Sequence, residues 1–210
     1  NMDSNSNILD VGCAQGDFLL DAKDRFGARI SGVDFNDNFN HDRFSEIDFH
    51  CGVLEDLNSL TSQSYDLITM WHYLEHCYEP KKSLEKVSDL LNQGGLVVIE
   101  VPRLDSVSGK LFGNKWQGIQ APVHTSLYTK NSLTRMVEES GLRVVDHLSY
   151  GAFPAYMYFY IGLYVKLFGK GINVERHVAP YFVGQILSFP FFAFERRLNL
   201  GMQTLICRKA

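Results

Sequence analysis

The chain has 210 residues, of which 45% are hydrophobic and 21% are charged, a balance that excludes an intrinsically disordered protein. Its net charge of −4 and the lack of a Lys/Arg run argue against a nucleic-acid backbone as the main partner. The four cysteines form no C-x-x-C pair, which argues against a zinc knuckle or a redox motif and favours a reducing compartment. The polar start, NMDSNSN, lacks the apolar segment of a signal peptide, so we expect a cytoplasmic protein.

Strand-like and helix-like segments alternate along the first half of the chain. Strands are expected at residues 8–11, 29–34, 48–51 and 65–71. A helix over residues 16–26 is expected to stop at Gly27, and Pro80 is expected to occupy the first position of another helix. Only seven residues precede the first strand, which raises the expectation of a trimmed chain.

The second half continues this alternation and then departs from it. We expect the segment 92–95 (NQGG) to end the helix before a strand at 96–101, and Thr129 to cap a helix that stops at Gly141. Further strands are expected at 142–148 and 201–209. Strands that alternate with helices predict an α/β fold with a mostly parallel sheet, here in a single domain over residues 1–210.

Residues 151–200 form an aromatic-rich insertion before the last expected strand. They hold 13 of the 25 Tyr and Phe residues of the chain (10 plus 15). Two nearly uncharged stretches, Phe153–Phe168 and Tyr181–Phe194, end near basic residues: Lys166 and Lys170, then Arg196 and Arg197. Prolines and glycines make both stretches poor membrane spans. Four interpretations remain open: helices lying at a membrane interface on the inner face, a lid over an apolar acceptor, a homodimer contact, and an ordinary buried subdomain.

The segment ILDVGCAQGDF, residues 8–18, joins a strand to a helix through a glycine turn. Gly12 permits a positive φ, and the helix that starts after Gly16 presents free N–H groups to a ligand. Asp34 ends the next strand 22 residues after Gly12 (34 − 12), where a carboxylate can accept both hydroxyls of a ribose. The spacing therefore predicts a site for a nucleoside-containing ligand.

Such a turn can bind either a dinucleotide or S-adenosyl-L-methionine, and two acidic residues distinguish between them. The third position of the G-x-G-x-x-G dinucleotide motif is occupied by Asp17, whose carboxylate would repel a pyrophosphate. Asp10 and Asp17 instead favour the ammonium and sulfonium groups of S-adenosyl-L-methionine. An NAD(P)-dependent oxidoreductase is the alternative enzyme class.

Five ordered blocks resemble the class I S-adenosylmethionine-dependent methyltransferases, particularly the ubiquinone-biosynthesis-like, type 23 branch. The blocks are DVGCAQGDF, GVDF, YDLITMWHYLEHCYEP, LLNQGGLVVIEVP and APVHTSLYTKNSLTRMVEESGL. The resemblance covers about residues 7–148 and the last strand. It implies a Rossmann-like three-layer sandwich with a seven-stranded, mostly parallel sheet whose last strand is antiparallel.

The resemblance also implies roles for individual residues. It places Asp10, Gly12, Cys13 and Gly16 on the methionine part of the donor, Asp34 on the ribose, Phe35 on the adenine, and Trp71 and His72 along the donor pocket. The chain departs from the family at Val53, where an Asp often reaches the adenine amine, so adenine recognition is expected from the backbone near Leu54, or from Glu55 or Asp56.

Three residues are candidates for catalysis. His72 to His76 match the inverted zinc-protease motif H-x-x-E-H, but the histidines follow a strand rather than share a helix, so we expect no metal site. His124 lies in a loop between a strand and a helix, where it either acts as the base for a hydroxyl acceptor or caps the helix. Glu75 and His76 are weaker candidates for the base.

These observations predict methyl transfer, most simply to the oxygen of a small-molecule, glycan or lipid-linked acceptor. A non-catalytic donor-binding or membrane-docked module is the alternative outside the enzymes.

Overall fold

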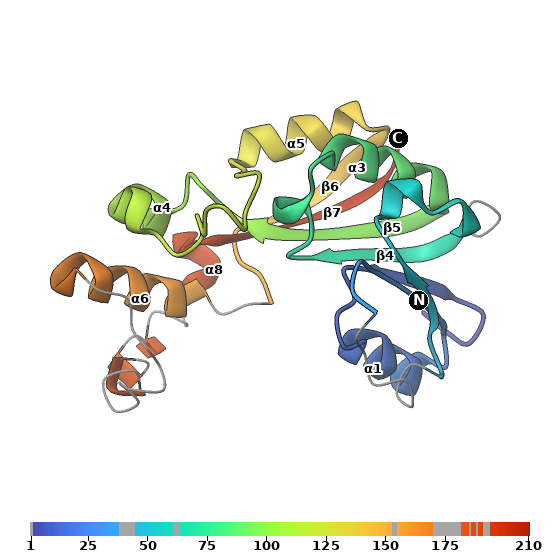
Figure 1. The fold of residues 1–210 in the computed structure, drawn as a ribbon, viewed down its shortest axis with the longest axis horizontal. Helices are drawn as coiled ribbons and strands as arrows, with labels where there is room; N and C mark the ends of the chain where they lie inside the picture. Colours follow the sequence, from blue (N-terminus) through green and yellow to red (C-terminus); the bar gives the residue numbers. More distant parts are fainter. Residues whose placement is uncertain are drawn as a thin grey trace.

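Seven strands form one mixed sheet in the order β3-β2-β1-β4-β5-β7-β6 (Figure 1). The computed structural model describes residues 2–37, 45–60, 64–152, 155–169, 182–184, 186–187, 189–190 and 194–210. The strands are β1 Asn7–Val11, β2 Arg29–Asp34, β3 Asp48–Cys51, β4 Tyr65–Trp71, β5 Leu91–Pro102, β6 Leu142–Leu148 and β7 Met202–Lys209. Strands β1 to β5 pair in parallel, whereas β7 is antiparallel to β5 and β6. The predicted Rossmann-like sheet with an antiparallel last strand is confirmed.

Helices cover both faces of this sheet. They are α1 Asp17–Phe26, α3 Pro80–Leu90, α4 Val107–Phe112, α5 Lys130–Glu139, α6 Ala155–Phe168 and α8 Glu195–Leu198. Figure 1 shows α3 and α5 on one face and α1 on the other. Each face has its own apolar cluster: Leu84 and Leu133 bury α3 and α5 in one, and Leu19 buries α1 in the other. Burial of these side chains is the main force that holds the three layers together.

Several predicted helix ends are confirmed. Gly27 ends α1 in a left-handed conformation, and Pro80 begins α3. The Thr129 hydroxyl accepts the N–H of Ser132 at the start of α5, as part of a capping box.

The predicted stop of α3 was wrong. The helix ends at Leu90, and residues 92–95 lie inside β5, which begins at Leu91. Leu91 pairs with Tyr65 of β4, and the register of the two strands shifts before the next pair, Leu67 with Leu96. This early pair places the start of β5 before the glycines that had suggested a turn.

The described part of the aromatic-rich segment packs against the rest of the domain. In Figure 1, α4, α6 and α8 lie together at one end of the sheet. The rings of Phe112 in α4 and Phe159 in α6 lie 5.4 Å apart, and a Cβ on Gly162 would meet Phe112 at 2.4 Å, so the two helices are in close contact. Phe159 also packs on the buried side chains of Leu200 and Met202.

Part of the predicted interfacial stretch lies outside the described residues, including Phe153, Pro154, Lys170 and Tyr181, and the Arg196 side chain is likewise outside them. Among the described helices, none combines the length and the apolar composition needed to cross a membrane.

Candidate active site

The predicted donor-binding residues meet at the carboxyl ends of β1, β2 and β4. Asp10 of β1 pairs with Gly32 of β2 and Thr69 of β4, so residues just beyond these positions reach the same edge of the sheet. In open α/β sheets this edge is where ligands bind. The strand order therefore brings together residues that are far apart in the sequence.

The glycine turn after β1 has the predicted geometry. Gly12 has a φ of 79°, and its N–H donates to the Val33 carbonyl over 2.8 Å. A Cβ at Gly12 would also lie 3.0 Å from the Tyr73 ring, so any larger residue would be strained and crowded. Gly16 is the N-cap of α1, with a φ of 71°, and Cys13 between the two glycines is buried.

The Asp34 carboxylate makes hydrogen bonds with the backbone of the glycine turn. Its Oδ2 accepts the Ala14 N–H over 3.0 Å, and its Oδ1 accepts the Asn36 N–H over 3.0 Å. The side chain is 8% exposed, so the carboxylate is held in one orientation at the end of β2. Each oxygen has a second lone pair, which is the acceptor capacity that two ribose hydroxyls require.

Asp10 is a buried carboxyl group on this edge with a raised pKa. It is 3% exposed, and its Oδ1 accepts the Thr69 hydroxyl over 2.6 Å. Burial raises the pKa of Asp10 to about 7, against the lowering effect of Thr69 and with a further increase from the Asp34 charge. A cationic ligand beside Asp10 would favour the ionised form.

Donor affinity is therefore expected to increase with pH through the titration of Asp10. Below pH 7 the carboxyl is largely protonated, and it must lose its proton to pair with the ammonium of S-adenosylhomocysteine. The Kd is expected to be about tenfold lower at pH 8 than at pH 6, as measured by calorimetry. In Asp10→Asn this dependence should disappear; a flat profile in the unsubstituted protein would contradict the role of Asp10.

On the side predicted to bind the adenine, two apolar side chains are exposed. Phe35 is 79% exposed directly after β2, and Val53 is 44% exposed after β3, whose last residue pairs with Asp34. The Leu54 side chain is fully buried, so only its backbone is available to a ligand. Glu55 accepts the Ser83 hydroxyl over 2.8 Å and thus ties the segment Leu54–Asp56 (η1) to α3.

Trp71 ends β4 and faces α1. Its ring makes an edge contact with Phe18 at 5.8 Å between centroids. The indole Nε1 is buried and has no hydrogen-bond partner among the described residues. Because buried donors normally have a partner, this N–H is available to a ligand, and the predicted place of Trp71 along the donor pocket stays a prediction.

His72 lies between two buried carboxylates, and its predicted place along the donor pocket stays a prediction. Its Nδ1 is 3.1 Å from Glu75 Oε1, and its Nε2 is 3.2 Å from Glu100 Oε1. Burial alone would lower the pKa of His72, but the contacts with Glu100 and Glu75 outweigh it and raise the pKa to about 9. Its φ of 51°, rare for a residue other than glycine, is thus held in place by two charged contacts.

The three candidate catalytic residues come together next to His72. The rings of His76 and His124 lie 4.8 Å apart at an angle of 74°. His76 Nδ1 faces the Val123 carbonyl at 3.1 Å, and His124 Nδ1 faces the Gly118 carbonyl at 2.8 Å. Because a carbonyl only accepts, each neutral ring carries its proton on Nδ1 and presents a lone pair at Nε2. Both histidines can therefore act as bases.

Glu75 completes this cluster. It is 1% exposed, and its Oε2 has no hydrogen-bond partner among the described residues. One donor atom each from Glu75, His76 and His124 lies within 4.8 Å of the other two, an arrangement of ligand types that could hold a divalent cation. The expectation of no metal site stays a prediction.

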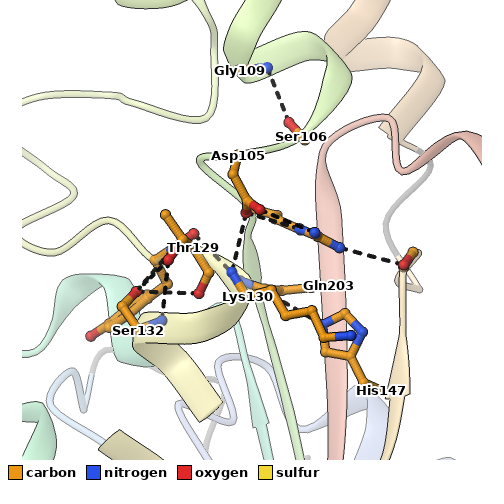
Figure 2. Close-up of polar contacts among 11 residues, drawn as sticks. Asp105, Ser106, Gly109, Thr129, Lys130, Ser132, His147 and Gln203 are labelled. Atoms are coloured by element: carbon orange, nitrogen blue, oxygen red, sulfur yellow. Dashed lines mark hydrogen bonds and ion pairs between the residues drawn. The ribbon is translucent and has the colours of Figure 1, made fainter. Parts of the chain in front are cut away.

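The segment that carries His124 is tied at its carboxyl-terminal end to the residues that follow β5. The Leu104 N–H donates to the Tyr128 carbonyl over 2.8 Å, and the Lys130 N–H donates to Asp105 over 3.1 Å. Figure 2 shows the Asp105–Lys130 contact, with the neighbouring hydrogen bond between His147 and Gln203. Thr129 and Ser132 cap α5, so the alternative role of His124 as the helix cap is wrong.

The same loop is also bonded to the segment Leu74–His76 (η3). The N–H groups of Thr125 and Ser126 both donate to the Glu75 carbonyl, at 2.8 and 3.2 Å. The Tyr128 hydroxyl donates to the Leu74 carbonyl over 3.1 Å. These bonds hold His124 beside His76.

Two residues of the site were missed in the sequence. Thr69 and Glu100 are both buried and polar within otherwise apolar strands. A polar side chain at a buried strand position needs a partner. The single polar residue in each of the apolar segments ITMW and VVIEVP could therefore have indicated Thr69 and Glu100.

A groove of about 790 Å³ lies at the opposite, amino-terminal end of the strands. Its lining includes Lys23, Arg29, Glu46 and Asp48 but none of the predicted donor or catalytic residues. Lys23 and Glu46 pair with each other over 2.7 Å. The groove is therefore separate from the site described above.

Comparisons with known proteins show the family of this chain. A family model described as a methyltransferase domain matches residues 1–147. A ubiquinone biosynthesis O-methyltransferase from Coxiella burnetii is 27% identical over 153 residues, which cover 67% of this chain and 64% of that protein. The chain thus spans less than two thirds of the length of this relative.

Solved structures support the same fold. The geranyl diphosphate C-methyltransferase from Streptomyces coelicolor, in complex with Mg²⁺, geranyl diphosphate and S-adenosyl-L-homocysteine, matches with a TM-score of 0.61 at 11% identity, over 100% of this chain and 74% of that one. A SAM-dependent methyltransferase from Archaeoglobus fulgidus matches with a TM-score of 0.60 at 20% identity, over 97% and 86%. The chain belongs to the methyltransferase-domain family, in the type 23 branch of the class I enzymes that use S-adenosylmethionine.

Proposed function

We propose that this chain transfers the methyl group of S-adenosylmethionine to a hydroxyl oxygen of a small acceptor. The observation that carries this proposal is the pair of histidines, His76 and His124, whose Nδ1 atoms both face backbone carbonyls. This leaves two basic Nε2 atoms close together, one on η3 after β4 and one in the segment before α5. The name of the Coxiella burnetii relative, an O-methyltransferase, supports oxygen as the acceptor atom.

In the proposed reaction, His124 Nε2 removes the proton of the acceptor hydroxyl while the oxygen attacks the methyl carbon. The bond from that carbon to the donor sulfur breaks, and S-adenosylhomocysteine leaves. Asp10 and the glycine turn would hold the methionine part, and Asp34 the ribose. The largest contribution of the protein is alignment, because methyl transfer is an in-line displacement.

The aromatic-rich segment is proposed to cover the acceptor and to favour apolar or lipid-linked acceptors. Its described residues expose large apolar side chains, including Leu167 at 67%, Phe168 at 65% and Ile186 at 71%. Lys166 lies among them and donates to the Leu111 carbonyl of α4. An apolar surface beside a cation suits a membrane interface, which would make the protein peripheral to the inner face of a membrane.

This proposal predicts a preference for acceptors that carry a long apolar chain. Between a phenol with an octyl chain and the parent phenol, kcat/KM is expected to differ by about tenfold or more, since each buried methylene contributes about 0.8 kcal/mol. The double variant Leu167→Ser, Phe168→Ser should reduce both this preference and co-sedimentation with anionic liposomes. Val145→Ser, at an exposed position on β6, is the matched control.

Equal rates for the two phenols, together with no binding to liposomes, would contradict the proposed role of the aromatic-rich segment in acceptor binding and would assign it a structural role only. Methylation of an amine but of neither phenol would contradict oxygen as the acceptor atom.

A further inference from the structure

Glu100 joins three separate parts of the chain at one buried carboxylate. It lies near the end of β5 and is 1% exposed. Its Oε2 accepts the Ala152 N–H over 2.7 Å and the Thr204 hydroxyl of β7 over 3.3 Å. Its Oε1 faces His72 Nε2 at 3.2 Å.

The contact with residues 150–152 is close enough to restrict the sequence there. A Cβ added to Gly151 would lie 2.5 Å from the Glu100 carboxylate, so a larger residue there would require the carboxylate to move. Thr204 also donates to the Tyr150 carbonyl over 2.9 Å. The chain leaving β6 is therefore held against Glu100 a few residues before α6 and the aromatic-rich segment begin.

From Glu100 the polar contacts continue to the candidate catalytic loop. His72 Nδ1 contacts Glu75 Oε1 at 3.1 Å, and the Glu75 carbonyl accepts the N–H of Thr125, the neighbour of His124. The contacts of Glu100 with Ala152, Thr204 and His72 come from three different segments. The network thus links the start of the aromatic-rich segment to the acceptor side of the site.

We propose that Glu100 is a positioning residue that sets the aromatic-rich segment against the acceptor site, so that acceptor binding depends on it and donor binding does not. This inference rests on the proposed function of that segment. A carboxylate serves this purpose because one oxygen fixes the 152 backbone while the other faces the His72 ring.

The test uses Glu100→Gln, which keeps the size of the side chain but leaves a single uncharged oxygen, so that the side chain can no longer accept from Ala152 and face His72 with an oxygen at the same time. We expect hydrogen exchange of the amides at 150–152 and in α6 to become about tenfold faster or more, with α1 unchanged. The KM for the octyl phenol should increase about tenfold, while the Kd for S-adenosylhomocysteine changes less than about twofold. Glu85→Gln, which removes an exposed carboxylate from α3, is the control.

Gly151→Ala disturbs the same contact by placing a methyl group against the Glu100 carboxylate. It should likewise make exchange at 150–152 faster and increase the KM for the octyl phenol. If Glu100→Gln fails to fold, Gly151→Ala carries the test. Unchanged exchange at 150–152, or a donor Kd that weakens as much as the acceptor KM, would overturn the proposal. A protein that methylates neither phenol would contradict the proposed function, whereas the exchange measurement would still decide whether Glu100 holds residues 150–152.

Discussion

Replacing His124 with asparagine is expected to reduce turnover by about 10²-fold or more, because it removes the proposed base. The asparagine side-chain amide can still donate to the Gly118 carbonyl, the contact that His124 Nδ1 makes over 2.8 Å, so the loop should keep its shape. The Kd for S-adenosylhomocysteine should change less than about twofold, since His124 is proposed to act on the acceptor and not on the donor. Single-turnover rates and calorimetry measure the two quantities separately.

His50→Asn is the control, because His50 makes a hydrogen bond with Ser59 at the far edge of the sheet. A loss of thermal stability with normal turnover in His124→Asn would assign His124 a structural role. The cluster of Glu75, His76 and His124 could supply a base or hold a divalent cation, and repeating the assay with EDTA distinguishes these two roles. Turnover that survives EDTA but not the substitution supports a base, whereas turnover lost to EDTA alone supports a cation held by Glu75, His76 and His124.

Asp34→Ala is expected to weaken donor binding by on the order of 2–4 kcal/mol, which is roughly 30- to 1,000-fold in Kd. Two charge-assisted hydrogen bonds to the ribose would be lost. The substitution also removes the acceptors of the Ala14 and Asn36 N–H groups, so part of the loss reflects a looser turn. Calorimetry with S-adenosylhomocysteine gives the affinity, and thermal denaturation without ligand gives the cost to the fold.

Asp34→Asn separates these effects, because its single oxygen can still accept one of the two backbone N–H groups. Asp24→Ala, at an exposed position on α1, is the control for loss of a negative charge. Unchanged affinity in a folded Asp34→Ala protein would remove Asp34 from the donor site.

Most of the fold could be predicted because its strands are short apolar runs bounded by turn residues. The strands at 29–34, 48–51, 65–71 and 142–148 have the predicted bounds, since local pattern and burial agree there. Strand β5 starts five residues earlier than expected because its first residues pair with β4, a contact that local pattern does not contain. Helix α4 was missed because its six residues, VSGKLF, are too few to show a helical period.

The site was predictable where one segment carries the chemistry and less so where partners come from distant segments. Gly12 and Asp34 could be identified from their spacing. The place of His72 between Glu75 and Glu100 could not, because its second partner lies on another strand. For the same reason the sequence could not show that His76 and His124, 48 residues apart (124 − 76), face each other.

The most direct test of donor identity is a calorimetric titration of the protein with S-adenosylhomocysteine and, separately, with NADH. The turn around Gly12, with Asp10 and Asp17 beside it, predicts saturable binding of S-adenosylhomocysteine that stabilises the fold, and no binding of NADH. Binding of NADH without binding of S-adenosylhomocysteine would contradict the assignment of this site to a methyl donor.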